Sequence, residues 1–468
     1  MKISDAMRLG RLDGMAQAEM VRRGEVSAVE LTEAAILRIE ALDPGLQAVS
    51  WRAWDLARER ARSPLPPGPL SGAPCLLKDS LHYPGMPARA GSASLPDTTT
   101  LQGFPYAARL DQAGLVPLGK TAMPEFGLLG VTEPQIGPVT RNPWDARRSP
   151  GGSSGGAGAA VASGMTPLAH GSDGAGSIRI PASCCGIVGL KPGRGATVRV
   201  RARHPIEDLL VADSLMARTV RDVAAGFALA RPGREAAPDG PESKRLRIAV
   251  IEHTLSGAVP HRDCRQALSE AAELLAALGH HVEAAQLPVD GPAADRAERV
   301  LWMHLGADCV DAARARGQDP AAVLEPWTLA LGRMADDLSP EDLERAHAQI
   351  ATLPGQLSSF AERFDVWLTP TLASPPPMIG HMAPDGEPEQ LMERMFGWLG
   401  YTPLQNLAGT PAVSLPLHWS PEGLPIGVML AGPRGSEDGL LKLACGLEAA
   451  RPWADRWPPL SLFGKEDA

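Results

Sequence analysis

The segment 149–195 limits the possible folds of this chain most, because its composition is that of a linker while its pattern is that of a packed core. Gly, Ser and Ala dominate the segment, and large side chains are rare. Flexible low-complexity linkers share this composition, but they have no use for interleaved aliphatic residues. The apolar residues of the segment are Val161, Met165, Ile178, Ile180, Ile187, Val188 and Leu190. The pattern therefore predicts closely packed backbone around a functional site.

Composition excludes several classes of protein. The chain has 468 residues, 44% of them hydrophobic, which is ample for a packed core and excludes wholesale disorder. Its net charge of −9 makes it a poor candidate for nucleic-acid binding, which requires a basic face. Six cysteines form no C-x-x-C pair, so no zinc ribbon is indicated. We expect a cytoplasmic protein without a membrane segment, because the sequence has neither a secretory h-region nor a run of about 18 apolar residues.

Local patterns predict helices and strands that alternate along the chain. Ser27 and Glu30 form a capping-box pattern that begins a helix, which we expect to end before Pro44. A short buried strand over 72–80 delivers Lys78 at its edge. A helix, a Gly turn and a strand are expected over 107–119. Further along, the predicted elements are strands at 246–252, 281–287, 365–370, 411–417 and 423–432, and helices over 263–278, from Ser339 and from Ser436. This order favours an α/β layered fold.

Residues 114–121 match the phosphate-binding pattern G-x-x-x-x-G-K-[ST], which suggests a nucleotide-binding protein that uses Lys120. The interior of the match is apolar and resembles a strand. Pro117 removes one of the backbone amides that would hold phosphate, and Pro124 obstructs the helix that should follow. A strand that ends in a turn is the better interpretation.

Residues 151–155 match G-x-S-x-G, the nucleophile turn of α/β-hydrolases, in which the serine works with a histidine. That turn must follow a strand, but residues 142–150 are charged and turn-like. The chain has eleven histidines, so counting alone does not exclude a triad that contains one. This reading remains the main enzymatic alternative at this point.

Taken together, the runs SPGGSSGGAGAAVASG (149–164) and HGSDGAGSIRIPAS (170–183) resemble the signature of the amidase signature hydrolases. The upstream pattern G-x-P-x-x-x-K-D is present over 72–79, and similar stretches lie at 119–127, 406–411 and 423–433. The resemblance implies an amidase-signature fold, with a mixed central β-sheet flanked by helices on both sides. We expect a single large α/β domain over 1–468, made of an N-terminal helical segment (about 1–62), a signature core (about 70–200) and a C-terminal α/β part (about 245–468).

The resemblance also implies a Ser–cisSer–Lys triad, in which Ser177 is the nucleophile, Ser153 the bridging cis-serine and Lys78 the base. A lysine accepts a proton only when neutral, so its reference pKa of about 10.4 must fall by roughly three units. Burial among hydroxyls and glycine backbone has this effect. Asp79 would oppose it, but alternation along a strand sends Asp79 to the opposite side.

Other residues around the triad have expected supporting roles. Backbone N–H groups of the turn Gly174, Ala175, Gly176 and Ser177 should face the developing oxyanion. Asp173 and Arg179 are expected to form a buried structural pair, and Ser154 to support the site by hydrogen bonding. Trp302, Trp327, Trp398 and Met395 are candidates for the acyl pocket.

The expected function is therefore hydrolysis of a carboxylic amide C–N bond, with a small-molecule amide as substrate, no cofactor and no metal. The alternatives are a glutaminase subunit of a tRNA-dependent amidotransferase, a hydrolase of cyclic or linear oligoamides or carbamates, and an inactive scaffold. Against the glutaminase stands Ile180, where that branch tends to have Gln after the arginine. Segments within 300–400 resemble the 6-aminohexanoate cyclic-dimer hydrolase branch. We expect no nucleic-acid or membrane partner, and a homodimer remains open.

Overall fold

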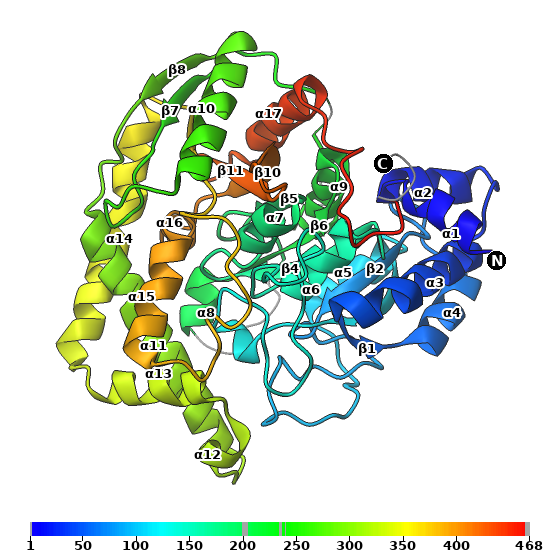
Figure 1. Cartoon of the computed structure of the whole chain (residues 1–468), viewed down its shortest axis with the longest axis horizontal. Helices are drawn as coiled ribbons and strands as arrows, with labels where there is room; N and C mark the ends of the chain where they lie inside the picture. The colour runs from blue at the N-terminus through cyan, green and yellow to red at the C-terminus, as the bar shows by residue number, and fades with distance from the viewer. Residues whose placement is uncertain (1, 199–204, 234–235, 239, 464–468) are drawn as a thin grey trace.

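A computed structural model describes residues 2–198, 205–233, 236–238 and 240–463. Within these ranges a single mixed sheet of eleven strands runs through the molecule, in the order β1-β3-β2-β4-β6-β5-β10-β11-β9-β7-β8 (Figure 1). The strands are β1 (Val49–Arg52), β2 (Pro74–Lys78), β3 (Val116–Thr121), β4 (Leu168–Asp173), β5 (Val188–Lys191), β6 (Ala212–Ala217), β7 (Arg247–Val250), β8 (His281–Ala284), β9 (Val366–Pro370), β10 (Ala412–Trp419) and β11 (Pro425–Ala431).

Helices cover both faces of this sheet, as the resemblance implies. They are α1 (Ile3–Gly10), α2 (Gly14–Arg22), α3 (Ala28–Leu46), α4 (Trp54–Arg62), α5 (Pro105–Gln112), the 3-10 helix η1 (Glu125–Gly127), α6 (Gly155–Ala162), α7 (Arg179–Cys185), α8 (Pro205–Leu210), α9 (Val220–Ala230), α10 (Arg262–Ala277), α11 (Gly291–Ala315), α12 (Pro320–Val323), α13 (Pro326–Asp336), α14 (Pro340–Ala361), α15 (Pro388–Leu399), α16 (Pro403–Ala408) and α17 (Glu437–Ala450).

Alternation along the strands divides the core between the two faces. Leu77 of β2 and Leu215 of β6 pack in one apolar cluster together with α9, α10 and α17. Their neighbours Leu76 and Met216 pack in another cluster with α3, α6 and α11. Successive residues of a strand point to opposite faces, so Lys78 belongs to the same face as Leu76.

The parallel and antiparallel strand pairs explain how the sheet is assembled. Strand β2 is parallel to both β3 and β4, and β7 is parallel to β8 and β9. The strands between these groups pair antiparallel, including β4 with β6 and β10 with β11. The sheet is therefore mixed, as predicted. The boundaries proposed for segments within the single domain stay a prediction.

Two local predictions about helix ends are corrected. The capping box of Ser27 and Glu30 is present, but α3 continues through Pro44 to Leu46. Pro44 lies in the last turn, where a missing N–H costs one hydrogen bond at most and the helix is about to end. Helix α17 begins after Ser436 as predicted, but the Ser436 side chain makes no capping bond.

Neither of the two competing glycine motifs has the structural context that its suggested function requires. Residues 116–121 of the phosphate-loop match form the buried strand β3, and Lys120 donates to the carbonyl of Leu81. In the described part of the chain no strand leads into Gly151, so the strand-turn-helix context of an α/β-hydrolase nucleophile is missing.

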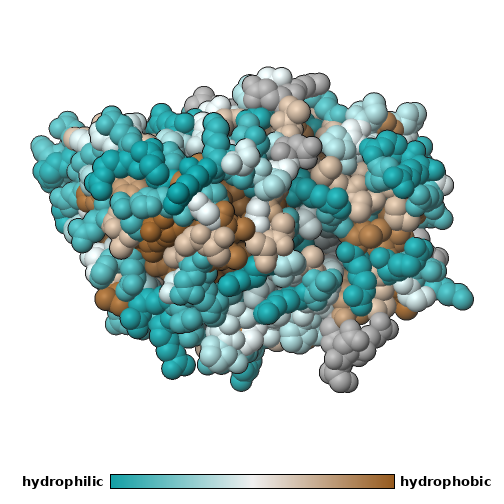
Figure 2. Space-filling view, turned by 90° about the horizontal axis from the view of Figure 1, so that it is seen from above, coloured by the Kyte–Doolittle hydropathy of each residue, from teal (hydrophilic) through white to brown (hydrophobic). Residues whose placement is uncertain are grey.

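On the face seen from above, hydrophilic side chains cover much of the surface (Figure 2). Seen from above, hydrophobic side chains gather in two areas that hydrophilic and intermediate residues separate (Figure 2). Each helix of the described ranges is too short or too polar to cross a lipid bilayer.

Candidate active site

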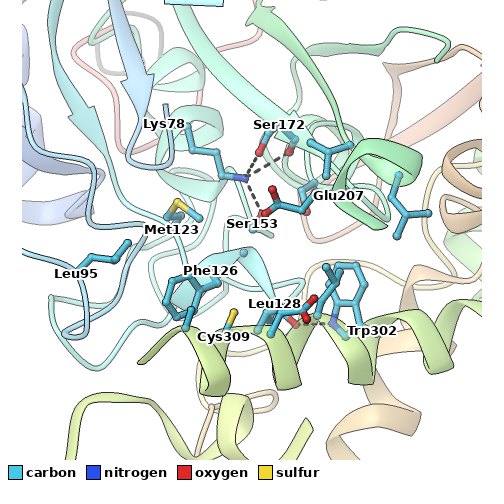
Figure 3. A pocket seen from close by; sticks show the side chains of 18 of the residues that line it. Lys78, Leu95, Met123, Phe126, Leu128, Ser153, Ser172, Glu207, Trp302 and Cys309 are labelled. Carbon is cyan, nitrogen blue, oxygen red and sulfur yellow. Dashed lines mark hydrogen bonds between the residues drawn. The ribbon is translucent and has the colours of Figure 1, made fainter. Parts of the chain in front are cut away.

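Lys78 is the last residue of β2, and its ammonium nitrogen contacts two other segments. Nζ donates to Ser153 Oγ over 2.6 Å, to Ser172 Oγ over 2.9 Å and to the Ser172 carbonyl over 3.4 Å (Figure 3). The side chain is 1% exposed. Hydroxyl and carbonyl oxygens therefore hold the lysine in a place that bulk water hardly reaches.

Ser153 lies in the turn before α6, and the peptide bond that joins it to Gly152 is cis. The backbone of this turn is packed so closely that side chains would not fit. A Cβ on Gly152 would lie 2.6 Å from the Val131 carbonyl oxygen, and one on Gly155 would lie 2.2 Å from Thr132 Oγ1. Both contacts are shorter than van der Waals separations, so the prediction of closely packed backbone is confirmed.

Ser177 lies in the turn between β4 and α7 and is 6% exposed. Its carbonyl accepts a hydrogen bond of 3.2 Å from the N–H of Ser154, which joins the two Gly/Ser-rich turns. Ser177 lines the same cavity as Lys78 and Ser153. In the described ranges no hydrogen bond joins the hydroxyls of Ser177 and Ser153. Contacts of this kind are often long in substrate-free sites and shorten when substrate binds.

The turn from Gly174 to Ser177 carries the predicted oxyanion donors. The N–H of Gly176 donates to Asp173 Oδ1 over 2.8 Å, and Thr402 Oγ1 donates to the Ala175 carbonyl over 2.6 Å. Gly176 has φ +133°, and a Cβ there would lie 2.4 Å from Thr402 Oγ1. Since the N–H of Gly176 is engaged, the remaining candidates for oxyanion donors are the N–H groups of Gly174, Ala175 and Ser177.

Asp173 and Arg179 form a fully buried ion pair behind this turn. Arg179 donates through Nε and Nη2 to the two carboxylate oxygens of Asp173, both over 2.9 Å. Burial alone would raise the pKa of Asp173, but Arg179 together with Lys191 and Asn406 holds it at about 2. Arg179 also donates to Gln405 and Asn406 of α16. Neither member of the pair lines the cavity, and Asp173 is hydrogen-bonded to the turn that does.

Ser154 and Ser172 connect α6 with β4. Ser154 Oγ donates to the Ser172 carbonyl over 3.2 Å and accepts from the Ser172 N–H over 3.3 Å. Ser172 in turn accepts two hydrogen bonds from Lys78. This exchange fixes the distance between the strand end that holds Lys78 and the turn that holds Ser153.

The cavity in front of the triad has a volume of about 390 Å³. Its walls are largely apolar, and charged side chains add to the lining. The lining consists of Lys78, Leu95, Met123, Phe126, Gly127, Leu128, Ser153, Ser172, Gly174, Ser177, Glu207, Leu210, Val211, Trp302, Leu305, Asp308, Cys309, Asp311, Ala312 and Arg316. No histidine belongs to this lining, which removes the support for a histidine triad. Within the described ranges no group of three or more His, Cys, Asp or Glu side chains is arranged to hold a metal ion.

The structure separates the four acyl-pocket candidates. Trp302 lines the cavity, whereas Trp327, Trp398 and Met395 lie in the apolar core behind it. Trp302 and Trp327 both donate their indole N–H to the carbonyl of Leu128, over 2.9 and 3.0 Å. The pocket role is therefore supported for Trp302 and wrong for the other three.

Sequence reasoning missed several residues of the cavity. Ser172 lies within the signature, but nothing in its spacing distinguishes it from the neighbouring serines. Glu207 reaches the cavity from the short helix α8, Phe126 from η1, and Leu128 directly follows η1 (Figure 3). Only the stretch 119–127, similar to the amidase family, pointed toward that last region.

Comparison with known proteins agrees with this geometry. The family model described as Amidase matches residues 30–441. A Mycobacterium tuberculosis protein that carries the name amidase AmiC is 39% identical, over 95% of this chain and 96% of its own. The 6-aminohexanoate-cyclic-dimer hydrolase of a Pseudomonas species is 34% identical, over 96% of each chain.

A solved structure of 6-aminohexanoate cyclic dimer hydrolase complexed with substrate has a similar fold. Its TM-score is 0.88 at 33% sequence identity, and the match covers 96% of this chain and 99% of the other.

Proposed function

Since this chain belongs to the amidase family and is an amide hydrolase, we propose that Ser177 attacks the amide carbonyl while Lys78 acts as base through Ser153. The observation that carries the proposal is the 2.6 Å hydrogen bond between Lys78 Nζ and Ser153 Oγ, in a cavity that Ser177 also lines. This hydroxyl lies within hydrogen-bonding distance of the buried lysine and faces the same cavity as Ser177.

The contacts of Lys78 fit a neutral amine. A neutral amine has two N–H bonds and one lone pair. The carbonyl oxygen of Ser172 can only accept, and the Ser172 hydroxyl can accept as well. In the neutral form the two N–H bonds are directed at Ser172, and the contact with Ser153 reverses, so that the Ser153 O–H donates to the lone pair of Nζ. In this arrangement Lys78 takes the proton of Ser153, and Ser153 takes the proton of Ser177.

The reaction then has two halves. Ser177 Oγ forms a bond to the carbonyl carbon, and the oxyanion is stabilised by N–H groups of Gly174, Ala175 and Ser177. When the intermediate collapses, the C–N bond breaks, and the leaving nitrogen receives a proton from Ser153, which Lys78 replaces. Water then attacks the acyl-enzyme carbonyl and gives a proton through Ser153 to Lys78. The C–O bond to Ser177 breaks, the carboxylic acid leaves, and the proton returns from Lys78 through Ser153 to Ser177 Oγ.

For the substrate we propose an amide with an uncharged, largely apolar acyl group. The apolar walls of the cavity support this class. Similarity to 6-aminohexanoate-cyclic-dimer hydrolase favours cyclic or linear oligoamides within it. Carbamates also contain a carbonyl bonded to nitrogen, so they are included among the substrates to be tested.

The proposal is tested with aliphatic, aryl and cyclic amides, carbamates and glutamine, each with the native protein and with Ser177→Ala. We expect the native protein to cleave apolar amides, and Ser177→Ala to lose at least about 10³-fold in kcat. Amide hydrolysis that persists in Ser177→Ala would overturn the mechanism. Preferential hydrolysis of glutamine would replace the substrate class with the glutaminase alternative.

A further inference from the structure

The cavity is elongated, because one face of α11 lines it over several turns. Trp302, Leu305, Cys309, Ala312 and Arg316 follow each other at helical spacing along this face. From Trp302 to Arg316 the helix rises by about 20 Å, at 1.5 Å per residue. The cavity therefore offers a substrate a slot along α11 (Figure 3).

One end of the slot is closed and the other is open. Trp302 is buried at 5% exposure, Leu305 and Cys309 are half-buried, and Ala312 and Arg316 are exposed. The ring of Trp302 packs edge-on against Phe396, with 6.1 Å between the centroids. At the other end Arg316 donates to Ser94 Oγ, which places Arg316 beside the cavity residue Leu95.

The triad lies between these ends. A Cβ on Gly127 would lie 3.0 Å from Ser153 Oγ, so Gly127 borders the relay serine directly. Its neighbour Leu128 accepts the hydrogen bond of Trp302 at the closed end. In Figure 3, Leu95 and Trp302 lie on opposite sides of Cys309, with Lys78 and Ser153 above it.

The order in which bonds break indicates which end of the slot holds the acyl group and which holds the amine. The amine leaves while the acyl group is still attached to Ser177, so the amine needs the exit to solvent. The acyl group can remain in the closed end. We propose that Trp302 sets the length of the acyl group that this enzyme accepts, by closing the buried end of the slot. This inference rests on the proposed function.

Trp327 provides a matched control. Its indole donates to the same Leu128 carbonyl as that of Trp302, and it is equally part of the apolar core, but it does not line the cavity. If Trp302 only holds Leu128 in place, replacing Trp327 should have the same effect as replacing Trp302. A role in contact with the acyl chain belongs to Trp302 alone.

The experiment measures kcat/KM for linear acyl p-nitroanilides of increasing chain length, with the native protein, Trp302→Leu and Trp327→Leu. We expect the optimum of Trp302→Leu to move to acyl chains longer by about two carbons, because each methylene that becomes buried is worth about four-fold. Trp327→Leu should reduce all lengths by the same factor. In a second series, with one acyl group and varied amines, Trp302→Leu should keep the native ranking.

An unchanged optimum in Trp302→Leu, or a change confined to the amine series, would overturn the inference. If Trp302→Leu does not fold, Trp302→Phe replaces it and must move the optimum in the same direction by a smaller amount. Failure of the proposed function looks different, because the native protein would then cleave none of the anilides.

Discussion

Two buried lysines of neighbouring strands show what makes one of them a candidate base. Lys78 ends β2, and Lys120 lies in β3, and both are nearly inaccessible to solvent. Burial lowers the pKa of Lys120 to about 8, against the opposing charge of Asp79. Lys120 nevertheless donates to a backbone carbonyl and lines no part of the cavity. Contact with a cavity hydroxyl, more than a lowered pKa, therefore identifies Lys78.

This difference predicts unequal effects of the same substitution. Lys78→Met should reduce kcat by about 10³-fold, since it removes the proton acceptor of Ser153. Lys120→Met should leave kcat within about ten-fold, because Lys120 touches no group of the triad. Steady-state kinetics on one apolar amide checks both variants, with thermal unfolding as the control for folding. Losses of similar size in both variants would contradict the assignment of Lys78.

Individual site residues were predictable from the sequence where they belong to a motif. Residues that only folding brings to the site were missed. Lys78, Ser153 and Ser177 are 75 and 24 residues apart, but matching patterns identified each of them. Glu207 and Leu128 reach the cavity through the placement of α8 and η1. No local sequence pattern distinguishes residues such as Glu207 and Leu128, which folding brings to the cavity, from similar residues elsewhere in the chain.

Among the elements, η1 and α13 are joined by one carboxylate. Glu125 of η1 accepts hydrogen bonds from the backbone N–H of Glu325 over 2.8 Å and from Thr328 Oγ1 over 2.6 Å. Glu125 thereby holds the N-terminal end of α13 through its N-cap residue Glu325 and through the Thr328 side chain. Its other oxygen accepts from Ser92 Oγ over 2.6 Å. Phe126, which lines the cavity, is the next residue of η1.

Removing this carboxylate should therefore loosen the cavity wall as well as the helix. Glu125→Ala is expected to lower the free energy of unfolding by about 2–4 kcal/mol, the loss of several hydrogen bonds to a buried carboxylate, and to raise KM. Glu125→Gln should recover most of both, because its amide oxygen can face the Glu325 N–H while its NH₂ donates to Ser92. Denaturant unfolding and KM measurements distinguish the variants. Equal defects in the two would show that hydrogen bonding at this position is unimportant.

Elements with one clear apolar stripe or strong end signals were predictable, such as α10, β9 and the capping box of α3. The 25-residue helix α11 was not predicted. Its residues face α13 and α14 as well as the cavity, so its apolar positions are spread over several faces and no single stripe stands out. Helix α8 is too short for any periodic pattern.

In the molecule as a whole, the sheet joins segments that are far apart in the chain. The N-terminal strands β1 to β6 and the C-terminal strands β7 to β11 meet where β5 pairs with β10 (Figure 1). The sequence predicted an α/β fold with a mixed sheet, and the comparisons confirm its family. The order of strands could not be read from local patterns, because it depends on pairing between segments that are far apart in the chain, by more than 200 residues for β5 and β10.

Several buried carboxyl groups predict how stability depends on pH. Burial raises the pKa of Glu325 to about 7, and the neighbouring Glu125 adds to the effect. Burial and Asp13 raise the pKa of Asp222 to about 7. Between about pH 4.5 and 7 the folded protein keeps protons that the unfolded chain has lost. The free energy of unfolding should therefore fall as pH rises through this range and then level off.

Glu325→Gln isolates one of these groups. The amide keeps an acceptor for the N–H of Gln135, which donates to Glu325 over 2.7 Å in the native protein, but it does not titrate. Between pH 5 and 8 the melting temperature should fall less steeply in this variant than in the native protein. The difference corresponds to about 3 kcal/mol in the free energy of unfolding over this range. A slope identical to that of the native protein would show that Glu325 is already ionised at pH 5.

In the proposed mechanism the hydroxyl of Ser153, linked to Lys78, makes Ser177 a nucleophile. Tandem mass spectrometry after reaction with a fluorophosphonate tests it most directly. We expect one adduct, on Ser177, in the native protein and almost none in Lys78→Met after the same exposure. An adduct on Ser153 or elsewhere in place of Ser177, or equal labelling of Ser177 without Lys78, would contradict it.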